Sequence, residues 1–132
     1  MERLYSYKMS HDNRFAPNPL FGVLTLATCK PQLRKNAKVG DWIAGWTSSH
    51  IAHTPTPVGE ERLIYLAKVS EKLTFAEYWE KYPAKRPVYT DDTSVLERYG
   101  DNIYKPVEGG FEQIRNVHHT DKNMAKDLRG QY

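Results

Sequence analysis

Residues 36–49 carry the sequence NAKVGDWIAGWTSS, in which a turn leads directly into a strand. The turn is expected at Val39-Gly40-Asp41, because glycine adopts positive φ angles at no steric cost. The strand is expected from Trp42 to Trp46, where aromatic and β-branched residues suit a half-buried, pleated surface. Gly45 within that strand indicates a bulge, or a place where a ligand or another backbone comes close.

Further strands are predicted on both sides of this stretch. Residues 4–9 alternate apolar with polar side chains, residues 20–29 form the most apolar run, and residues 62–70 are almost continuously apolar. The proline- and asparagine-rich residues 11–19 predict a loop. We also expect a basic connector at residues 30–36 and an exposed loop at residues 48–60.

Helices are predicted in the second half of the chain. Thr74-Phe75-Ala76-Glu77 has the form of a capping box and predicts a helix that Pro83 ends. Residues 93–99 predict a second, short helix, closed by Gly100 in a left-handed cap. Residues 111–117 are compatible with a strand or irregular structure, and the tail after Asp121 predicts a polar helix with that residue as its cap.

The predicted order is a strand, a loop, three strands, two helices and a last strand. Because few strand pairs are joined by long helices, a doubly wound parallel sheet is disfavoured. A chain of 132 residues is long enough for one domain with an ordinary core. We therefore expect a single α+β domain over residues 1–132, a small curled mixed or antiparallel β-barrel with two or three short helices at its edge.

Composition narrows the classes of function. Aromatic residues make up 12% of the chain, which favours a folded domain over a disordered one. The net charge of +3 permits contact with nucleic acid or a nucleotide without requiring it. Cys29 is the single cysteine, so no internal disulfide forms and a cytoplasmic setting is expected. No apolar run approaches the roughly 20 residues that cross a bilayer, so no membrane partner is expected.

Two segments resemble the core of PUA-like domains, the superfamily that includes EVE and ASCH modules. In those domains a valine-glycine-aspartate turn leads a barrel strand, as in residues 39–45 here. The next strand carries small and branched apolar residues, as residues 62–69 do. The resemblance implies a barrel fold.

A longer set of motifs, kept in order along the chain, resembles the second family of nucleotide-modification-associated domains. The motifs are His11-Asp12, Phe15-Ala16-Pro17-Asn18-Pro19, Cys29-Lys30-Pro31, Gly40-Asp41-Trp42-Ile43, Leu73-Thr74-Phe75-Ala76-Glu77-Tyr78-Trp79, Gly100-Asp101-Asn102-Ile103-Tyr104 and His118-His119. This resemblance implies a link to modified DNA bases in bacteria and their phages, which is a context and not a reaction. The family pattern continues into a final aromatic-rich strand, whereas this chain stops at Tyr132, as is expected either of a shortened member or of a truncated chain.

Acid–base chemistry is one interpretation of the histidines and carboxylates. A histidine beside a carboxylate serves as a general acid or base, because its ordinary pKa of about 6.5 lies near neutral pH. If the chain is an enzyme, the candidate catalytic residues are His11, Asp12, Asp101 and His118. No metal site is expected, because zinc needs three or four convergent ligands and adjacent histidines in a strand face opposite ways. No nucleotide-cofactor fingerprint is present, so no cofactor is expected.

Ligand binding is the other interpretation of the same motifs. Amides and carboxylates such as those of Asn18, Asp101 and Asn102 are the groups that read base edges. Aromatic side chains stack on a flipped base, and Trp42 is expected in the core instead. The histidine pair is equally compatible with two partly exposed loop side chains. The candidate ligand-binding residues are Phe15, Asn18, Trp46, Asn102, Tyr104 and His119.

A basic cluster and the cysteine complete the candidates. Lys30, Arg34, Lys35 and Lys38 are candidates for holding a phosphate backbone, although a solvated connector has the same composition. Cys29 beside a lysine is compatible with an activated thiol. At the end of a very apolar strand, however, a buried and inert cysteine is the favoured interpretation.

Three functions remain open from the sequence. The first is a module that binds a nucleobase or nucleotide, with a modified DNA base as the ligand preferred on family grounds. The second is an enzyme that acts on a nucleotide or modified base with histidine and aspartate as acid and base. The third is a small protein-interaction factor in the conflict between phage and host.

Overall fold

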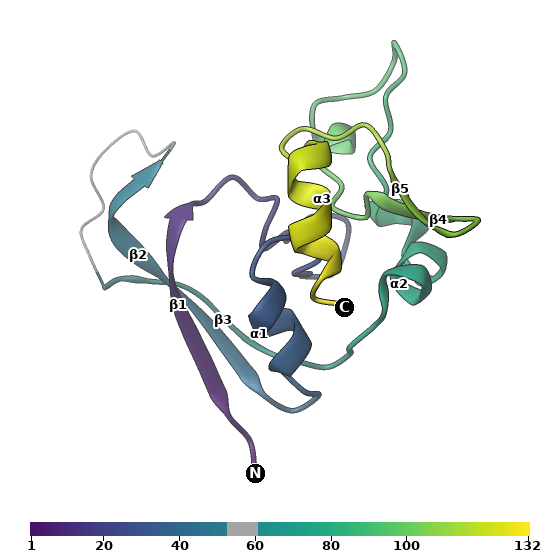
Figure 1. The fold of residues 1–132 in the computed structure, drawn as a ribbon. Helices are drawn as coiled ribbons and strands as arrows, with labels where there is room; N and C mark the ends of the chain where they lie inside the picture. The colour runs from purple at the N-terminus through teal and green to yellow at the C-terminus, as the bar shows by residue number, and fades with distance from the viewer. Residues whose placement is uncertain (53–60) are drawn as a thin grey trace. The chain divides into compact units, whose positions relative to one another are not determined.

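A computed structural model describes residues 1–52 and 61–132 of the chain. The described residues divide into two compact units, each built from two separated parts of the sequence (Figure 1). Unit 1 comprises residues 1–13 and 36–72, and unit 2 comprises residues 14–35 and 73–132. The single domain expected over residues 1–132 stays a prediction.

Unit 1 contains a mixed sheet of three strands. The strands are β1 (Leu4–His11), β2 (Trp42–Ala52) and β3 (Leu63–Lys68), in the order β1-β2-β3. β1 is parallel to β2, whereas β3 is antiparallel to it. The strands predicted at residues 4–9, 42–46 and 62–70 are therefore confirmed. β2 continues to Ala52 and so includes part of the segment expected as a loop, while residues 53–60 lie outside the described chain.

The turn before β2 has the predicted form. Gly40 adopts a φ of +96°, and the carboxylate of Asp41 accepts hydrogen bonds from the backbone N–H groups of Arg3, at 3.0 Å, and Lys38, at 2.9 Å. At Gly45 the predicted bulge is present, whereas the group that comes close is a side chain rather than a ligand or another backbone. The β2–β3 register shifts after it, and a Cβ at this position would lie 2.4 Å from Cε1 of Tyr65.

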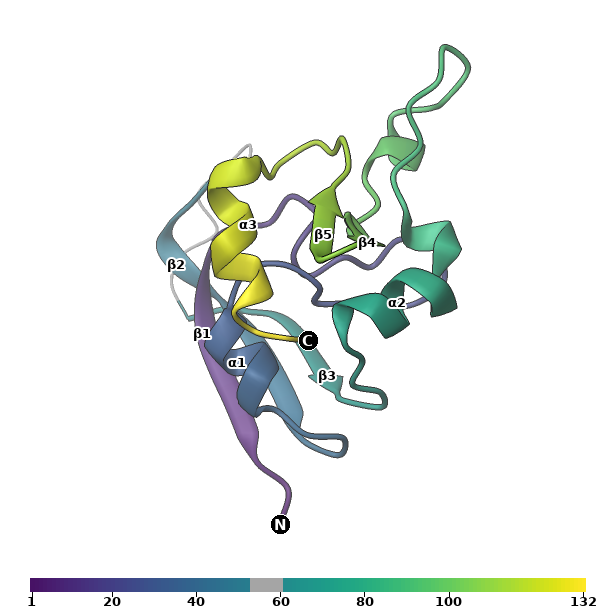
Figure 2. The same ribbon diagram turned by 45° about the vertical axis from the view of Figure 1, so that its right-hand side comes forward.

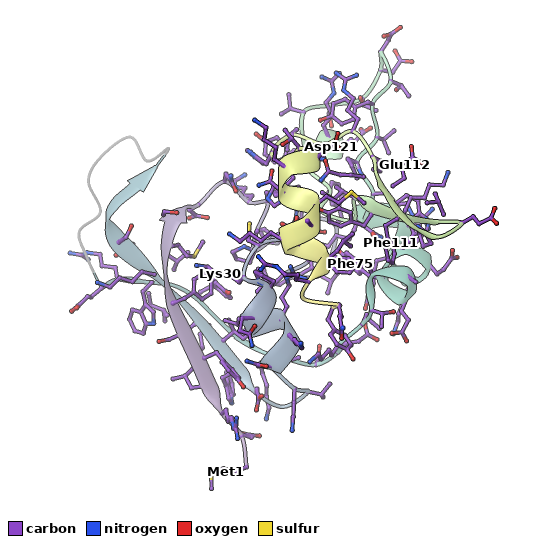
Figure 3. All side chains as sticks on the ribbon, viewed as in Figure 1. Met1, Lys30, Phe75, Phe111, Glu112 and Asp121 are labelled. Carbon is purple, nitrogen blue, oxygen red and sulfur yellow. The ribbon has the colours of Figure 1, made fainter. Side chains whose placement is uncertain are left out.

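Unit 2 packs short helices and a hairpin around an aromatic core. Its elements are α1 (Pro31–Asn36, whose last residue belongs to unit 1), α2 (Phe75–Lys81), the 3-10 turns η1 (Pro83–Lys85) and η2 (Leu96–Arg98), the antiparallel hairpin β4 (Tyr104–Val107) and β5 (Gly110–Gln113), and α3 (Asp121–Leu128). Phe75 lies edge-on to Tyr104 and Phe111, at ring-centroid distances of 5.3 and 6.0 Å. Figure 3 shows Phe75 and Phe111 close together in this core.

Capping residues set the starts of two helices in unit 2. The predicted capping box of α2 is confirmed, since the Glu77 N–H donates to Oγ1 of Thr74 at 3.2 Å and the Thr74 N–H donates to Oε1 of Glu77 at 2.9 Å. The polar helix of the tail also forms, as α3. Its N-cap is Thr120 rather than the predicted Asp121, because Thr120 has an extended backbone and its N–H donates to the Asn123 side chain.

The strand predicted at residues 20–29 does not form. This run makes an isolated bridge between Asn18 and Thr25, and it is interrupted by positive φ angles at Phe21, Gly22 and Cys29. A residue with φ near +60° leaves the β region and ends strand pairing. Apolar composition alone therefore predicted the wrong local structure.

Four further predictions are corrected in the described residues. The connector at residues 30–36 forms α1, and the helix expected at residues 93–99 is reduced to η2. Gly100 is not a left-handed cap: it is buried, and a Cβ there would lie 2.2 Å from the carbonyl oxygen of Lys85. Residues 1–52 and 61–132 form two separate sheets and no closed barrel.

Candidate functional site

Two aspartates, each 1% exposed, organise the polar interior of unit 2. A buried carboxylate is stable only where hydrogen bonds or opposite charges replace its lost hydration. Asp101 lies just before β4 and Asp127 lies in the last turn of α3. Their partners differ in chemistry, and this difference separates a structural cluster from a candidate site.

The Asp101 cluster has the character of a scaffold. Asp101 accepts hydrogen bonds from the hydroxyls of Tyr78, at 2.5 Å, and Thr25, at 2.6 Å. Lys85 is fully buried, and its ammonium donates to the carbonyl oxygen of Asn18 at 2.9 Å and to its Oδ1 at 3.0 Å. Burial raises the pKa of Asp101 and lowers the pKa of Lys85 to about 8. These contacts tie residues 18–25 to α2 and η1.

The Asp127 cluster joins three groups that carry chemistry. Oδ1 of Asp127 accepts the backbone N–H of Cys29 at 2.8 Å. Oδ2 lies 2.6 Å from the hydroxyl of Tyr104 and 2.6 Å from Nδ1 of His119. Burial alone raises the pKa of Asp127, but the hydrogen bonds from His119 and Tyr104 outweigh it and leave this pKa below its ordinary value. Asp127 is therefore an anion at neutral pH.

His119 links this carboxylate to the sulfur of Cys29. Its Nε2 lies 3.4 Å from Sγ, on the opposite side of the ring from Asp127. Burial by itself lowers the pKa of His119, but the hydrogen bonds to Asp127 and Cys29 and the charge of Asp127 raise it to about 9. The imidazolium therefore faces the sulfur with Nε2–H and the carboxylate with Nδ1–H.

Local structure holds Cys29 in this position. Cys29 has a φ of +60° and lies two residues before α1, which lies beside α3 in both views of the ribbon (Figures 1 and 2). Arg34, on α1, is 5% exposed and donates from Nε to the carbonyl oxygen of Cys29 at 2.6 Å and from a terminal nitrogen to that of Asp127 at 2.8 Å. It also donates to the carbonyl oxygen of Tyr132. A non-glycine residue in the left-handed region is strained, and such residues concentrate at functional sites.

The order sulfur, imidazole, carboxylate is that of an activated nucleophile. One nitrogen of the base faces the nucleophile, and the other is held by a third group that fixes its tautomer and orientation. The same three groups cannot chelate one metal ion, because sulfur and carboxylate contact opposite nitrogens of the ring. Among the described residues, no set of three histidine, cysteine or acidic side chains is arranged to hold a metal.

The residues predicted to read base edges have structural partners instead. Asn18 is fully buried and its Nδ2 donates to the carbonyl oxygen of Tyr99 at 2.7 Å. The Nδ2 of Asn102 donates to the carbonyl oxygens of Tyr78 and Tyr82, both at 3.0 Å. Tyr104, whose ring was expected to stack on a base, is buried, and its hydroxyl donates to Asp127.

The histidine pair divides between two environments. His119 is half-buried in the Asp127 cluster, whereas His118 is exposed. Both imidazoles lie 5.2 Å from the ring of Phe15, which is buried, and His118 also meets the edge of Tyr99 at 5.8 Å. Phe15 is thus a core residue beneath the pair. Asp101, expected as a catalytic partner of His118, directs both of its oxygens to Tyr78 and Thr25.

The remaining predicted residues are distributed over both units. Unit 1 holds Asp12, which is exposed, the half-buried Trp46 and the exposed Lys38, and it also holds His11, whose side chain lies outside the described part. In the proposed phosphate cluster, Lys30 and Lys35 are exposed in unit 2. Lys30 stands at the start of α1 (Figure 3). Arg34 is buried, and its guanidinium is engaged by carbonyl groups of the chain.

Sequence reasoning missed two members of the Asp127 cluster. Asp127 was not singled out because it lies in an otherwise polar helix. Cys29 was expected to be inert at the end of a strand that does not form. The available signal was a single cysteine together with a histidine and an aspartate far along the chain, a combination compatible with nucleophilic catalysis.

Comparison with known proteins supplies a family but no close relative. No helix among the described residues is long and apolar enough to span a membrane. Neither a curated protein nor a solved structure matches the chain. A family model described as "Nucleotide modification associated domain 2" matches residues 1–131. The chain therefore belongs to the nucleotide modification associated domain 2 family, with a role linked to nucleotide modification.

Proposed function

We propose that this domain is a thiol-dependent enzyme that acts on a nucleotide or a modified base. The observation that carries the proposal is the continuous contact from Cys29 through His119 to Asp127, at 3.4 and 2.6 Å. The family supports the nucleotide part of the proposal. The cysteine cluster supports an enzyme over a reader, because it has the arrangement of a catalytic group rather than of a base-reading surface.

Each member of the cluster has a distinct role in the proposed mechanism. The proton of the thiol already resides on His119, whose pKa is raised to about 9, and the sulfur of Cys29 attacks an electron-poor carbon of the substrate. The Nε2–H of His119 then returns the proton to the group that leaves or to the atom that becomes basic. Asp127 holds the imidazole by Nδ1 and stabilises its positive charge.

A module that only binds bases receives less support from the residues named for it. The side chains of Asn18, Asn102 and Tyr104 are buried and their polar atoms are hydrogen-bonded within unit 2. Releasing these groups toward a ligand would break buried hydrogen bonds, which costs roughly 1–3 kcal/mol for each unsatisfied group. The acid–base chemistry assigned from sequence to His118 and Asp101 passes in this proposal to His119 and Asp127.

The test is the reactivity of Cys29, which needs no knowledge of the substrate. We expect iodoacetamide to alkylate the wild-type protein at neutral pH roughly tenfold faster than the His119→Asn variant. Because Cys29 is the single cysteine, the Cys29→Ser variant gives the background. His118→Asn is the matched control, and it should react like wild type. Equal rates in wild type and His119→Asn would refute the proposed nucleophile.

A substrate screen then tests the nucleotide part. Wild-type protein and Cys29→Ser are incubated with nucleotides and oligonucleotides that carry hydroxymethylated or glycosylated bases, and base masses are measured. Conversion by wild type and not by Cys29→Ser is the expected result. Equal conversion by both proteins would contradict the role of the thiol.

A further inference from the structure

Two arginines share one tyrosine ring in the segment between α2 and β4. The guanidinium carbon of Arg115 lies 4.2 Å from the ring centroid of Tyr89, and that of Arg98 lies 5.3 Å from it. Tyr89 lies between η1 and η2, and the segment that joins these two turns forms the green loop extending from unit 2 in Figures 1 and 2. Arg115 is exposed, while Arg98 and Tyr89 are half-buried. We call these three residues the arginine–tyrosine clamp.

The clamp concentrates positive charge without neutralising it. Since both groups contact one ring, the two cations lie within about 10 Å of each other, close to the Debye length at 0.1 M salt. In residues 1–52 and 61–132, neither guanidinium has a carboxylate partner within ion-pair distance. Like charges held this close repel each other, so an anion bound between them would be stabilised.

Two other arginines of unit 2, Arg34 and Arg86, have their donors engaged by the protein. Arg34 is buried against carbonyl oxygens, and Arg86 stacks on Trp79 while it donates to the carbonyl oxygen of the same residue. Arg98, by contrast, makes one hydrogen bond, from Nε to Oγ1 of Thr93 at 3.3 Å. Within the described chain, the terminal nitrogens of Arg98 and Arg115 have no protein acceptor.

We propose that the arginine–tyrosine clamp binds the phosphate backbone of a polynucleotide. The planar fork of a guanidinium matches two phosphate oxygens, and stacking on Tyr89 orients both forks before the ligand arrives. This inference rests on the proposed function and narrows its substrate from a free nucleotide to a base within a strand. It also moves the phosphate contact away from the basic residues at 30–38.

Two pairs of residues that are adjacent in the sequence connect the clamp to the cysteine site. Arg98 precedes Tyr99, whose ring meets the imidazole of His118 at 5.8 Å. His118 precedes His119, which contacts Cys29. A strand held by the clamp would therefore run past the exposed side of His118 toward the thiol.

The test measures the salt dependence of binding to an unmodified, single-stranded oligonucleotide. Fluorescence anisotropy is recorded from about 50 to 200 mM KCl, and the logarithm of the binding constant is plotted against that of the salt concentration. Each lost phosphate contact lowers the slope by about 0.7 for a single strand, so the double variant Arg98→Gln/Arg115→Gln should lower it by about 1.4. The control Lys105→Gln/Lys122→Gln removes two exposed charges of unit 2 and should keep most of the slope.

A double variant that conserves charge tests whether any loss of binding comes from the lost charges or from misfolding. Arg98→Lys/Arg115→Lys keeps both charges, so it should retain the salt slope while it weakens binding through loss of the planar forks. Three results would each overturn the clamp. The first is an equal salt slope for Arg98→Gln/Arg115→Gln and wild type, and the second is an equal loss of slope in Arg98→Gln/Arg115→Gln and in the control Lys105→Gln/Lys122→Gln. The third is no binding by wild type at low salt. The alkylation rate of Cys29 in the same variants keeps the two proposals apart. If Cys29 is reactive but the clamp variants bind the oligonucleotide like wild type, the protein is an enzyme for free nucleotides. If the clamp variants lose binding but Cys29 is unreactive, the protein is a module that binds a strand.

Discussion

Replacing Asp127 by asparagine is the sharpest perturbation of the cysteine site. The change conserves shape, and the amide oxygen can still accept the N–H of Cys29, now 2.8 Å from Oδ1. It removes the negative charge that lies 2.6 Å from Nδ1 of His119. Because burial alone lowers the pKa of His119, we expect this pKa to fall from about 9 to 6.5 or below.

The size of this effect follows from the difference between the two pKa values. A fall from about 9 to the ordinary value of 6.5 corresponds to roughly 3 kcal/mol of lost interaction with the imidazolium. At neutral pH the imidazole changes from mostly protonated to mostly neutral. The alkylation rate of Cys29 should therefore fall in this variant, as is also expected for His119→Asn.

The assay is a titration of the histidine ring signals by two-dimensional NMR, with His119→Asn used to assign the signal. Asp121→Asn makes the same substitution at an exposed position in the first turn of α3 and should leave the His119 pKa unchanged. Urea unfolding confirms that each variant is folded before its titration is interpreted. A His119 pKa in Asp127→Asn within half a unit of the wild-type value would refute the electrostatic reasoning.

Three further predictions concern stability, each measured as the free energy of unfolding in urea. The raised pKa of His119 stabilises the folded state, and this stabilisation is complete below pH 6.5 and is lost as the pH rises through about 9. The free energy of unfolding of wild type should therefore fall by about 1–2 kcal/mol between pH 6.5 and 8. His119→Gln should not show this loss, and an equal loss in both proteins would contradict the assignment. Lys85→Met should destabilise by about 3–5 kcal/mol, because it removes the buried ammonium that donates to two oxygens of Asn18 and leaves Asp101 without a nearby cation. A change below about 1 kcal/mol would mean that the Lys85 ammonium is dispensable. Gly45→Ala should destabilise by about 1–3 kcal/mol, because its Cβ would lie 2.4 Å from Tyr65 and 2.7 Å from Met9, and a neutral result would exclude this close approach.

Local patterns were enough to predict the sheet of unit 1 and the start of α2. Alternation and β-branched content act over a few residues, so the strands near residues 4–9, 42–46 and 62–70 could be read directly. The capping box of Thr74 and Glu77 is also local, since its two hydrogen bonds join residues three positions apart. The turn at Gly40 and the bulge at Gly45 followed from the properties of glycine.

Local patterns failed where backbone angles depend on distant partners. Residues 20–29 have the composition of a strand, yet Cys29 takes a φ of +60° while its N–H bonds to Asp127 and its carbonyl oxygen accepts from Arg34. Gly100 was expected at a helix end, but the need for close packing against the backbone of Lys85 explains a glycine there. These contacts cannot be inferred from the residues beside each position.

The sequence by itself determined which chemical groups this protein has: one cysteine, a histidine pair, an aspartate in the motif of residues 100–104, and membership of a nucleotide-linked family. Only the tertiary structure decided which of them meet. Cys29 and Asp127 are 98 positions apart, and the fold of unit 2 brings them together through His119. It also turned Asn18, Asn102 and Arg34 inward, because a buried polar group must find its hydrogen-bond partner within the protein.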